Sequence, residues 1–473
     1  MIELMKFYKI LLPIILLVTS AMADHAGAID ATQLSAMWGI PFAGLLLSIA
    51  VLPLVAAKFW HQHYGKVAAA WGSIVIAMIY NKFGIAIVLQ DTLNTLFHHY
   101  IPFLCLIGAL FTLGGGIHIK LHGETTPALN SALLGIGTLL ASAIGTTGAA
   151  MLLIRPLIEL NKHRKSSAHV VIFFIFLVAN IGGCLTPLGD PPLFLGFLNG
   201  IEFTWPLFNL YKPLATIALP LLLIFWAFDH YMFYRHKDLR RWEPEDDISK
   251  LLVQGKRNMA IMPCVIGIII ISGIWDGTGP IELIHGVSIE MSDLVRDLSL
   301  ICLAMLSRLI TPKKIYKYNN FSWEPFLEVV KLFAGIFIAM IPVTAMLEAG
   351  ESGAFAPMVA LANTDGIPNE NIYFWLTGLL SAFLDNAPAY LVFFHMAGGD
   401  PNVLMSSLNP VLVGISSAAV FMGAMTYIGN APNFMVKAIA EHQQVKMPSF
   451  VGYMLWSCAL LLPLFLLMNY LWL

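Results

Sequence analysis

Two polar motifs interrupt hydrophobic segments of this chain at a spacing of 240 residues. TPLGDPPL at residues 186–193 aligns with TYIGNAPN at residues 426–433, and both share Thr, Gly, an Asp or Asn, and Pro at matching places. A second matched pair lies just upstream, SAIGTTGA at residues 142–149 and SAFLDNAP at residues 381–388. Hydroxyl, amide and carboxylate oxygens are the ligands that hard cations such as sodium prefer. The residue types therefore predict a site for a small monovalent cation.

Asp385 is the residue that we expect to couple the cation to a proton. A carboxylate at membrane depth is costly when ionised, so protonation comes within physiological reach, and a proton and a cation then exclude one another. Asp190, in the other half, is either a second ligand or titrating group, or the cap of a half-helix that begins at Pro191. Asn430 is its neutral counterpart. His395 is a candidate proton relay to Asp385.

The threonines of the motifs have two possible roles. Hydroxyls in membrane helices often bond back to backbone carbonyls, but at a helix break they can also bind an ion. We favour ion binding for Thr147 and Thr186 over Thr146 and Thr426. The glycines beside the breaks are expected to serve backbone geometry and close approach; they are Gly182, Gly183, Gly189 and Gly429. Arg155 is predicted to pair with Glu159 four residues on, with a role in substrate binding as the alternative.

Broken helices must position these side chains. Residues 180–192 (NIGGCLTPLGDPP) contain three Gly and three Pro in thirteen positions, a density that no continuous helix accommodates. Unwinding leaves carbonyl groups free at the end of one half-helix and N–H groups free at the start of the next, which suits ion binding. Within a bilayer such backbone is tolerated only where it faces protein, water or a ligand. Paired breaks in two halves of a chain are typical of a transporter site.

The composition predicts an all-α polytopic membrane protein. Of 473 residues, 58% are hydrophobic and 11% are charged, whereas soluble domains average about 25% charged residues. A net charge of −2 gives no basic field for nucleic acid. The five cysteines show no CxxC spacing, so we interpret them as buried apolar residues.

Hydropathy and loop charge predict two repeats of inverted topology. Each repeat has three scaffold helices, one re-entrant hairpin (residues 129–158 and 372–397), one broken helix and one closing helix, and this arrangement places the basic loops inside. Residues 1–23 resemble a signal peptide, or else form an uncleaved amphipathic N-terminus. The repeats then cover residues 24–233 and 258–473, joined by a cytoplasmic linker at residues 234–257. Both termini are predicted outside the membrane. The predicted spans are residues 37–57, 67–89, 101–116, 205–228, 261–275, 294–310, 326–347 and 451–473.

The motifs LSAFLDNAP (residues 380–388) and LTPLGDPPLFLG (residues 185–196) resemble the ion transporter superfamily, especially its sodium:proton antiporter-like and citrate-transporter-like branch. The resemblance implies a homodimer with a scaffold domain and a transport domain that moves like an elevator. It also implies which residues bind the ion: Thr146, Thr147, Thr186, Asp190, Asp385, Asn386, Thr426 and Asn430. The dicarboxylate carriers of this superfamily resemble one another in having Ser-Asn-Thr at both hairpin tips, which this chain lacks.

The leading hypothesis is sodium (or lithium):proton antiport across a bacterial inner membrane, with Asp385 as the shared carboxylate. The alternative is sodium- or proton-coupled uptake of citrate or another carboxylate, including a metal-citrate complex whose metal would reduce the substrate's charge. An intramembrane enzyme is disfavoured because the spans contain no HExxH or GxSxG set. No resident cofactor is expected; Na+ and H+ are cargo. The expected partners are the lipid bilayer and a small ion or carboxylate, with no nucleic acid.

Overall fold

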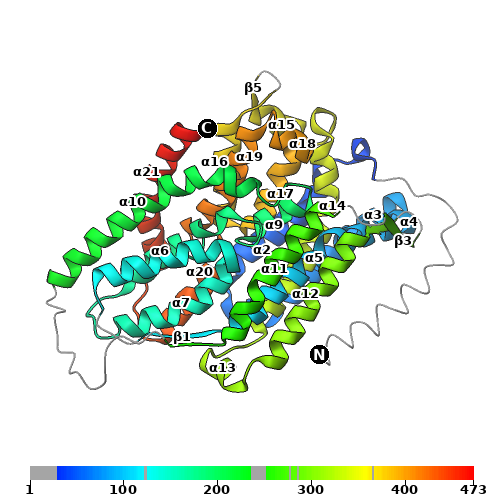
Figure 1. Cartoon of the computed structure of the whole chain (residues 1–473). Coiled ribbons are helices and arrows are strands. Elements are labelled where there is room, and N and C mark those ends of the chain that lie inside the picture. The colour runs from blue at the N-terminus through cyan, green and yellow to red at the C-terminus, as the bar shows by residue number, and fades with distance from the viewer. Residues whose placement is uncertain (1–28, 122–124, 236–251, 276–278, 285–286, 365–366) are drawn as a thin grey trace.

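The computed structural model describes residues 29–121, 125–235, 252–275, 279–284, 287–364 and 367–473. The predicted signal peptide and most of the predicted linker lie outside these ranges. The described chain is helical almost throughout, which confirms the all-α class (Figure 1). Its strands form three small antiparallel pairs: β1 (His118–Lys120) with β2 (Leu252–Gln254), β3 (Pro280–Ile284) with β4 (Val287–Glu290), and β5 (Asn363–Thr364) with β6 (Ile367–Pro368).

The first half begins with helices that precede the first hairpin. They are α2 (Ile40–Val55), α3 (Ala57–Phe83), α4 (Ile85–Thr95), the π-helical turn η3 (Leu96–Tyr100) and α5 (Ile101–Gly115), after two short 3-10 turns, η1 (Ala31–Gln33) and η2 (Ala36–Gly39). The predicted span at residues 67–89 is wrong in its bounds. Gly84 has φ of +83°, a conformation that glycine adopts readily, and it ends α3 in the middle of the predicted segment.

A helical hairpin and a broken helix follow in the first half. The hairpin consists of α6 (Pro127–Ile144) and α7 (Thr146–Asn161), with Gly145 at its tip at φ of +82°. The next helix, α8 (Ala168–Leu177), stops before the glycines, and the chain continues as a 3-10 turn, η4 (Ile181–Leu185), and then as α9 (Pro191–Leu198). The interruption lies where the Gly and Pro residues predict it. The long helix α10 (Trp205–Arg235) closes the half.

The second half repeats this order. It starts with α11 (Lys256–Ile274), α12 (Met291–Ile310), α13 (Lys313–Tyr318), α14 (Glu324–Glu348), η5 (Gly350–Ser352) and α15 (Ala356–Ala362). Next come a hairpin of α16 (Glu370–Phe383) and α17 (Asn386–Met396) and the short helix α18 (Pro401–Met405). The broken helix follows as α19 (Asn409–Met422), η6 (Gly423–Met425) and α20 (Ala431–His442), and α21 (Phe450–Trp472) is the closing helix. The element order of the two halves therefore corresponds from hairpin to closing helix.

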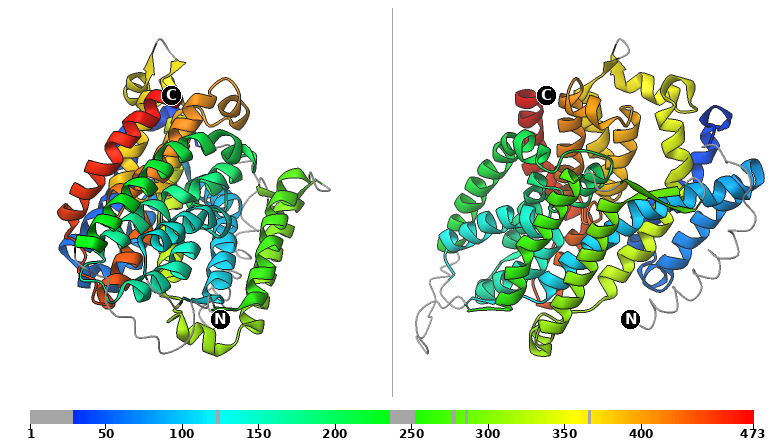
Figure 2. Two further views of the ribbon diagram at one scale, coloured as in Figure 1. Left: turned by 60° about the vertical axis from the view of Figure 1, so that its left-hand side comes forward. Right: turned by 45° about the vertical axis from the view of Figure 1, so that its right-hand side comes forward.

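The helices gather into two groups. Figure 1 shows α6, α7, α10, α20 and α21 on one side and α3, α4, α5, α12 and α14 on the other, and the right-hand view of Figure 2 also shows the two groups apart. Helix α14 packs on α3 and α12 packs on α5, while α16 packs on α19 and α10 on α21. Among the described residues, eight helical stretches are long and apolar enough to cross a membrane. The chain is a polytopic membrane protein.

Candidate functional site

Both hairpin tips and both helix breaks meet at the carboxylate of Asp190, which is 2% exposed. Thr146 Oγ1 donates a hydrogen bond of 2.7 Å to its Oδ1, and Asn430 Nδ2 donates one of 3.2 Å to the same oxygen. Asn386 Nδ2 donates to Oδ2. No described lysine or arginine contacts Asp190. A buried carboxylate is thus held by three neutral donors from both halves of the chain.

Asp190 does not cap its own helix. It occupies the position before α9, as Asn430 does before α20, but neither side chain bonds to its helix N-terminus. The Asp190 carboxylate instead contacts the two hairpin tips and the second helix break. The first hairpin tip is tied to the first break, because the backbone N–H of Thr146 donates to Gly189 O at 2.8 Å. Of the alternatives for Asp190, the arrangement fits a ligand or titrating group better than a cap.

Thr186 and Thr426 fasten each break to its own hairpin. Thr186 Oγ1 donates to Ser142 O at 2.5 Å and accepts from the N–H of Leu188, while Thr426 Oγ1 donates to Ala382 O at 2.5 Å and accepts from the N–H groups of Ile428 and Gly429. Both hydroxyls are occupied by backbone groups. This is the local role that threonines in membrane helices commonly have.

These bonds also fix which residues of the two halves are equivalent. The bonded carbonyls, Ser142 and Ala382, are 240 residues apart, as are Thr186 and Thr426. The same spacing makes Thr146, the first residue of α7, equivalent to Asn386, the first residue of α17. A letter-by-letter match of SAIGTTGA with SAFLDNAP instead places Thr147 opposite Asn386. That match is one residue out at this position, because Thr146 and Asn386 are the first residues of α7 and α17.

Thr147 lies outside the hydrogen-bonded group. It is half-buried, and its side chain makes no hydrogen bond to any described residue.

We expect Thr146→Val to lower transport about tenfold or more, because a hydrogen bond to a charged group contributes about 1.5–3 kcal/mol. Thr147→Val, the same change one residue on, is expected to alter transport less than about twofold. Initial rates in proteoliposomes compare the two, and a larger loss at Thr147 would contradict this assignment.

Asp385 supplies a second carboxylate near the first. It precedes α17, is half-buried, and interacts electrostatically with Asp190. His395 lies at the other end of α17, ten residues away, which is about 15 Å along a helix. Its Nδ1 lies 2.9 Å from Oε1 of Glu348 in α14. A direct proton transfer from His395 to Asp385 is therefore not supported by this geometry.

Two amide oxygens beside Asp190 have unused bonding capacity. Oδ1 of Asn386 and Oδ1 of Asn180 are buried and accept no hydrogen bond from the described residues. A Cβ added at Gly423 would fall 3.1 Å from Asn180 Oδ1 and 3.6 Å from Asn386 Nδ2, so the two amides face one small region. Unpaired amide oxygens next to carboxylates fit a dehydrated monovalent cation. The donor set is thus chemically suited to the predicted cargo.

Asn180 and Asn433 are members of this network that sequence reasoning missed. Asn180 Nδ2 donates to Asn433 Oδ1 at 2.7 Å and so joins the two broken helices directly. Asn433 Nδ2 in turn donates to Gly423 O and Thr426 O, at 2.8 and 2.9 Å. The sequence signals them only as amides inside interrupted apolar segments. In the structure both are fully buried.

The glycines of the motifs allow the breaks to approach their neighbours. At Gly182, Gly189 and Gly429 an added Cβ would lie between 2.0 and 2.6 Å from a backbone carbonyl oxygen. At Gly183 it would lie 2.6 Å from Cγ2 of Thr146 and 3.0 Å from Cβ of Asp190. Any side chain at Gly183 would therefore push Thr146 away from Asp190.

Arg155 and Glu159 do not form the predicted pair in the described structure. Glu159 instead pairs with Lys162 on an exposed face, whereas Nη1 of Arg155 is buried and has no hydrogen-bond partner among the described residues. The two side chains turn to different environments although they are one helical turn apart. An unpaired guanidinium is thus present in α7, on the helix that begins at Thr146.

A cavity lies apart from Asp190. It has a volume of about 580 Å³ and lies between α4, η3 and α14 on one side and α17 on the other. Its titratable lining groups are Asp91, His98, His99, Glu348 and His395. Neither Asp190 nor its three donors line it, so the carboxylate site is closed from this cavity in the described state.

Comparison with known proteins places the chain in a family. A family model described as "Putative citrate transport" matches residues 31–473, nearly the whole chain. The chain belongs to this family. The match confirms the resemblance of its motifs to the citrate-transporter-like branch of ion transporters. A search of curated proteins found no match.

Family membership and fold together define the broad function. The citrate-transport family and the eight apolar helices identify a citrate-transporter-like secondary transporter, rather than an enzyme, that spans a membrane several times. Its substrate belongs to the small carboxylates or ions that such transporters carry.

Proposed function

We propose that this transporter exchanges sodium or lithium for protons at a site formed by Asp190 and Asp385. Two carboxylates in one buried region cannot both remain charged without compensation. Either a metal ion or protons must neutralise them, and the two therefore compete. The sequence predicted Asp385 alone as the shared acid; the proposal now rests on the pair.

The observation that carries this proposal is the bonding of Asp190. Its carboxylate is almost fully buried, receives only neutral donors, and is bonded by Asn386, whose own Oδ1 accepts no hydrogen bond from the described residues. A site built to hold a multivalent anion would need cationic side chains at this place. The arrangement instead offers oxygen ligands and negative charge, which suit a cation.

The symmetry of the site supports alternating access by the proposed inverted repeats. Hairpins and broken helices recur in the same order in both halves, with their contacts 240 residues apart. Such pairs commonly build a midplane site around which one part of a carrier moves against the other. We propose re-entrant hairpins, an elevator-type movement and a homodimer on this basis together with the motif resemblance.

The proposal is tested by flux through purified protein in proteoliposomes. With a pH-sensitive dye inside, an outward sodium gradient is expected to acidify the lumen, lithium is expected to replace sodium, and potassium is expected to have no effect. Citrate should not be required. If lumenal pH responds to no cation while radiolabelled citrate accumulates, the antiport proposal fails.

Citrate or metal-citrate uptake is the second candidate. It is favoured by the family match and by Nη1 of Arg155, a buried guanidinium nitrogen that has no hydrogen-bond partner among the described residues and would suit a carboxylate group. The same vesicles with radiolabelled citrate supplied outside, with and without magnesium, distinguish it from antiport. Citrate uptake that depends on sodium or on a proton gradient would establish this candidate in place of the first.

A further inference from the structure

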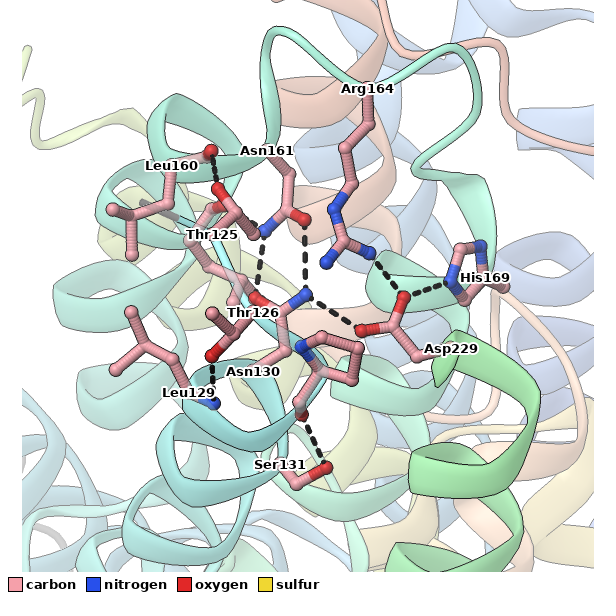
Figure 3. Close-up of polar contacts among 12 residues, drawn as sticks. Thr125, Thr126, Leu129, Asn130, Ser131, Leu160, Asn161, Arg164, His169 and Asp229 are labelled. Carbon is pink, nitrogen blue, oxygen red and sulfur yellow. Dashed lines mark hydrogen bonds and ion pairs between the residues drawn. The ribbon is translucent and has the colours of Figure 1, made fainter. Parts of the chain in front are cut away.

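A second buried polar cluster lies where α6, α7, α8 and α10 meet, away from Asp190. At its centre is Asp229 of α10, which is fully buried. Its Oδ1 accepts from Arg164 and, at 2.8 Å, from His169 Nε2, and its Oδ2 accepts from Asn130 Nδ2 at 3.0 Å (Figure 3). Asn130 and Asn161 complete the cluster with a reciprocal amide pair at 3.0 and 2.9 Å.

The cluster leaves hydrogen-bonding groups unused on its cationic side. Because a carboxylate only accepts, the ring nitrogen of His169 that faces Asp229 must carry a hydrogen. The other ring nitrogen, Nδ1, has no partner although His169 is only 3% exposed, and Figure 3 shows it turned away from Asp229. Nε and Nη2 of Arg164 are also buried and have no hydrogen-bond partner in the described structure.

A cavity of about 200 Å³ lies against His169. Its polar lining consists of Ser166, His169 and Lys446, and its apolar wall includes Phe228, Met232 and Trp456. Phe228 makes edge contacts with both the His169 ring and the Trp456 ring, at centroid distances of 5.3 and 5.5 Å, so the wall is continuous. The cavity therefore has a hydroxyl, an imidazole and an ammonium group on one side and an aromatic surface on the other.

The position of the cavity along the membrane spans suggests its ligand. His169 begins one span (Ala168–Leu185), Phe228 and Met232 are near the end of another (Trp205–Arg235), and Lys446 immediately precedes a third (Phe450–Trp472). Basic side chains at span ends that fall on the cytoplasmic side of a membrane commonly bind anionic lipid headgroups, and tryptophan is favoured at that depth.

We propose that this cavity binds the phosphate group of an anionic membrane phospholipid. Ser166 Oγ and Lys446 Nζ donate to the phosphate oxygens, which lie beside the His169 ring. The glycerol and the first acyl carbons lie along Phe228, Met232 and Trp456. This proposal does not depend on which substrate the protein transports.

Equilibrium binding to the purified full-length protein in neutral detergent tests it. The probes are short-chain phosphatidylglycerol, short-chain phosphatidylcholine and inorganic phosphate, measured by calorimetry. We expect phosphatidylglycerol to bind at least tenfold more tightly than phosphatidylcholine. Lys446→Gln is expected to weaken phosphatidylglycerol binding at least fivefold without affecting the fold, because Lys446 is exposed.

His169→Gln provides the readout that a structural role alone would not produce. The glutamine amide can still donate to Asp229, but it offers no ring nitrogen to the cavity, so phosphatidylglycerol binding should weaken while the thermal unfolding temperature stays near that of the wild type. Lys317→Gln is the matched control, since Lys317 is an exposed lysine of α13 that does not line the cavity. The proposal is overturned if phosphatidylglycerol and phosphatidylcholine bind equally, if inorganic phosphate alone binds as tightly, or if Lys317→Gln weakens binding as much as Lys446→Gln.

Discussion

Asp190→Asn is expected to reduce sodium:proton exchange by about 30-fold or more, because losing one partner of a buried charged contact costs about 2 kcal/mol or more. The substitution keeps the shape of the side chain and removes only its charge and its ability to bind a proton. Transport measured as pH-dependent sodium efflux from proteoliposomes should fall accordingly. Asp385→Asn is expected to act in the same direction, since both carboxylates are needed to hold the cation.

Two measurements separate this effect from misfolding. The Asp190→Asn protein should unfold thermally at or above the wild-type temperature, because an uncompensated buried carboxylate costs free energy in the folded state. Asp400→Asn makes the same chemical change at an exposed cap of α18, where asparagine caps equally well, and it should leave transport unchanged. Full exchange activity in Asp190→Asn would rule out Asp190 as the shared carboxylate.

Asp229→Asn is expected to lower the free energy of unfolding by about 3–5 kcal/mol, because removing one partner of a buried ion pair leaves the other charge uncompensated. In this case the remaining charge is Arg164, whose side chain is only 4% exposed. The loss should appear as a lower thermal unfolding temperature and as aggregation during gel filtration in detergent.

Lys162→Gln serves as the comparison for Asp229. It breaks the pair between Lys162 and Glu159, whose side chains are 51% and 60% exposed, and pairs of that kind contribute about 0–1 kcal/mol. A similar unfolding temperature for Asp229→Asn and Lys162→Gln would mean that the Asp229 cluster does not stabilise the fold.

The sequence predicted the interruptions and the class of fold because both follow from local chemistry. Clustered glycine and proline residues do not sustain a continuous helix, so the breaks after α8 and α19 could be placed from composition alone. The end of α3 was missed because a single glycine such as Gly84 is compatible with a continuing helix in an apolar segment. The hairpin register was missed because the one-residue difference between the two tips leaves the letters of the motifs similar.

Which residues form the site was harder to predict than where the site lies. Asp190 and Asp385 lie in equally polar motifs, and only the folded chain shows that Asn386 and Asn430 both point to Asp190. Asn180 was missed because its partner, Asn433, lies 253 residues away. The Asp229 cluster has the same character: its partners are 60 to 99 residues distant, with no periodicity that would connect them.

The two repeats have acidic residues at different positions, and this difference limits how many protons one transport cycle can exchange. Asp190 corresponds to the neutral Asn430, and Asp385 corresponds to Gly145 at the same spacing of 240 residues. Under the proposed function, the two similar halves create one composite site with two ionisable groups, and not two separate sites. Under the proposed exchange, this site can release at most two protons for each cation that it takes up. Measuring the reversal potential would then show whether each turnover is electroneutral or moves net charge across the bilayer.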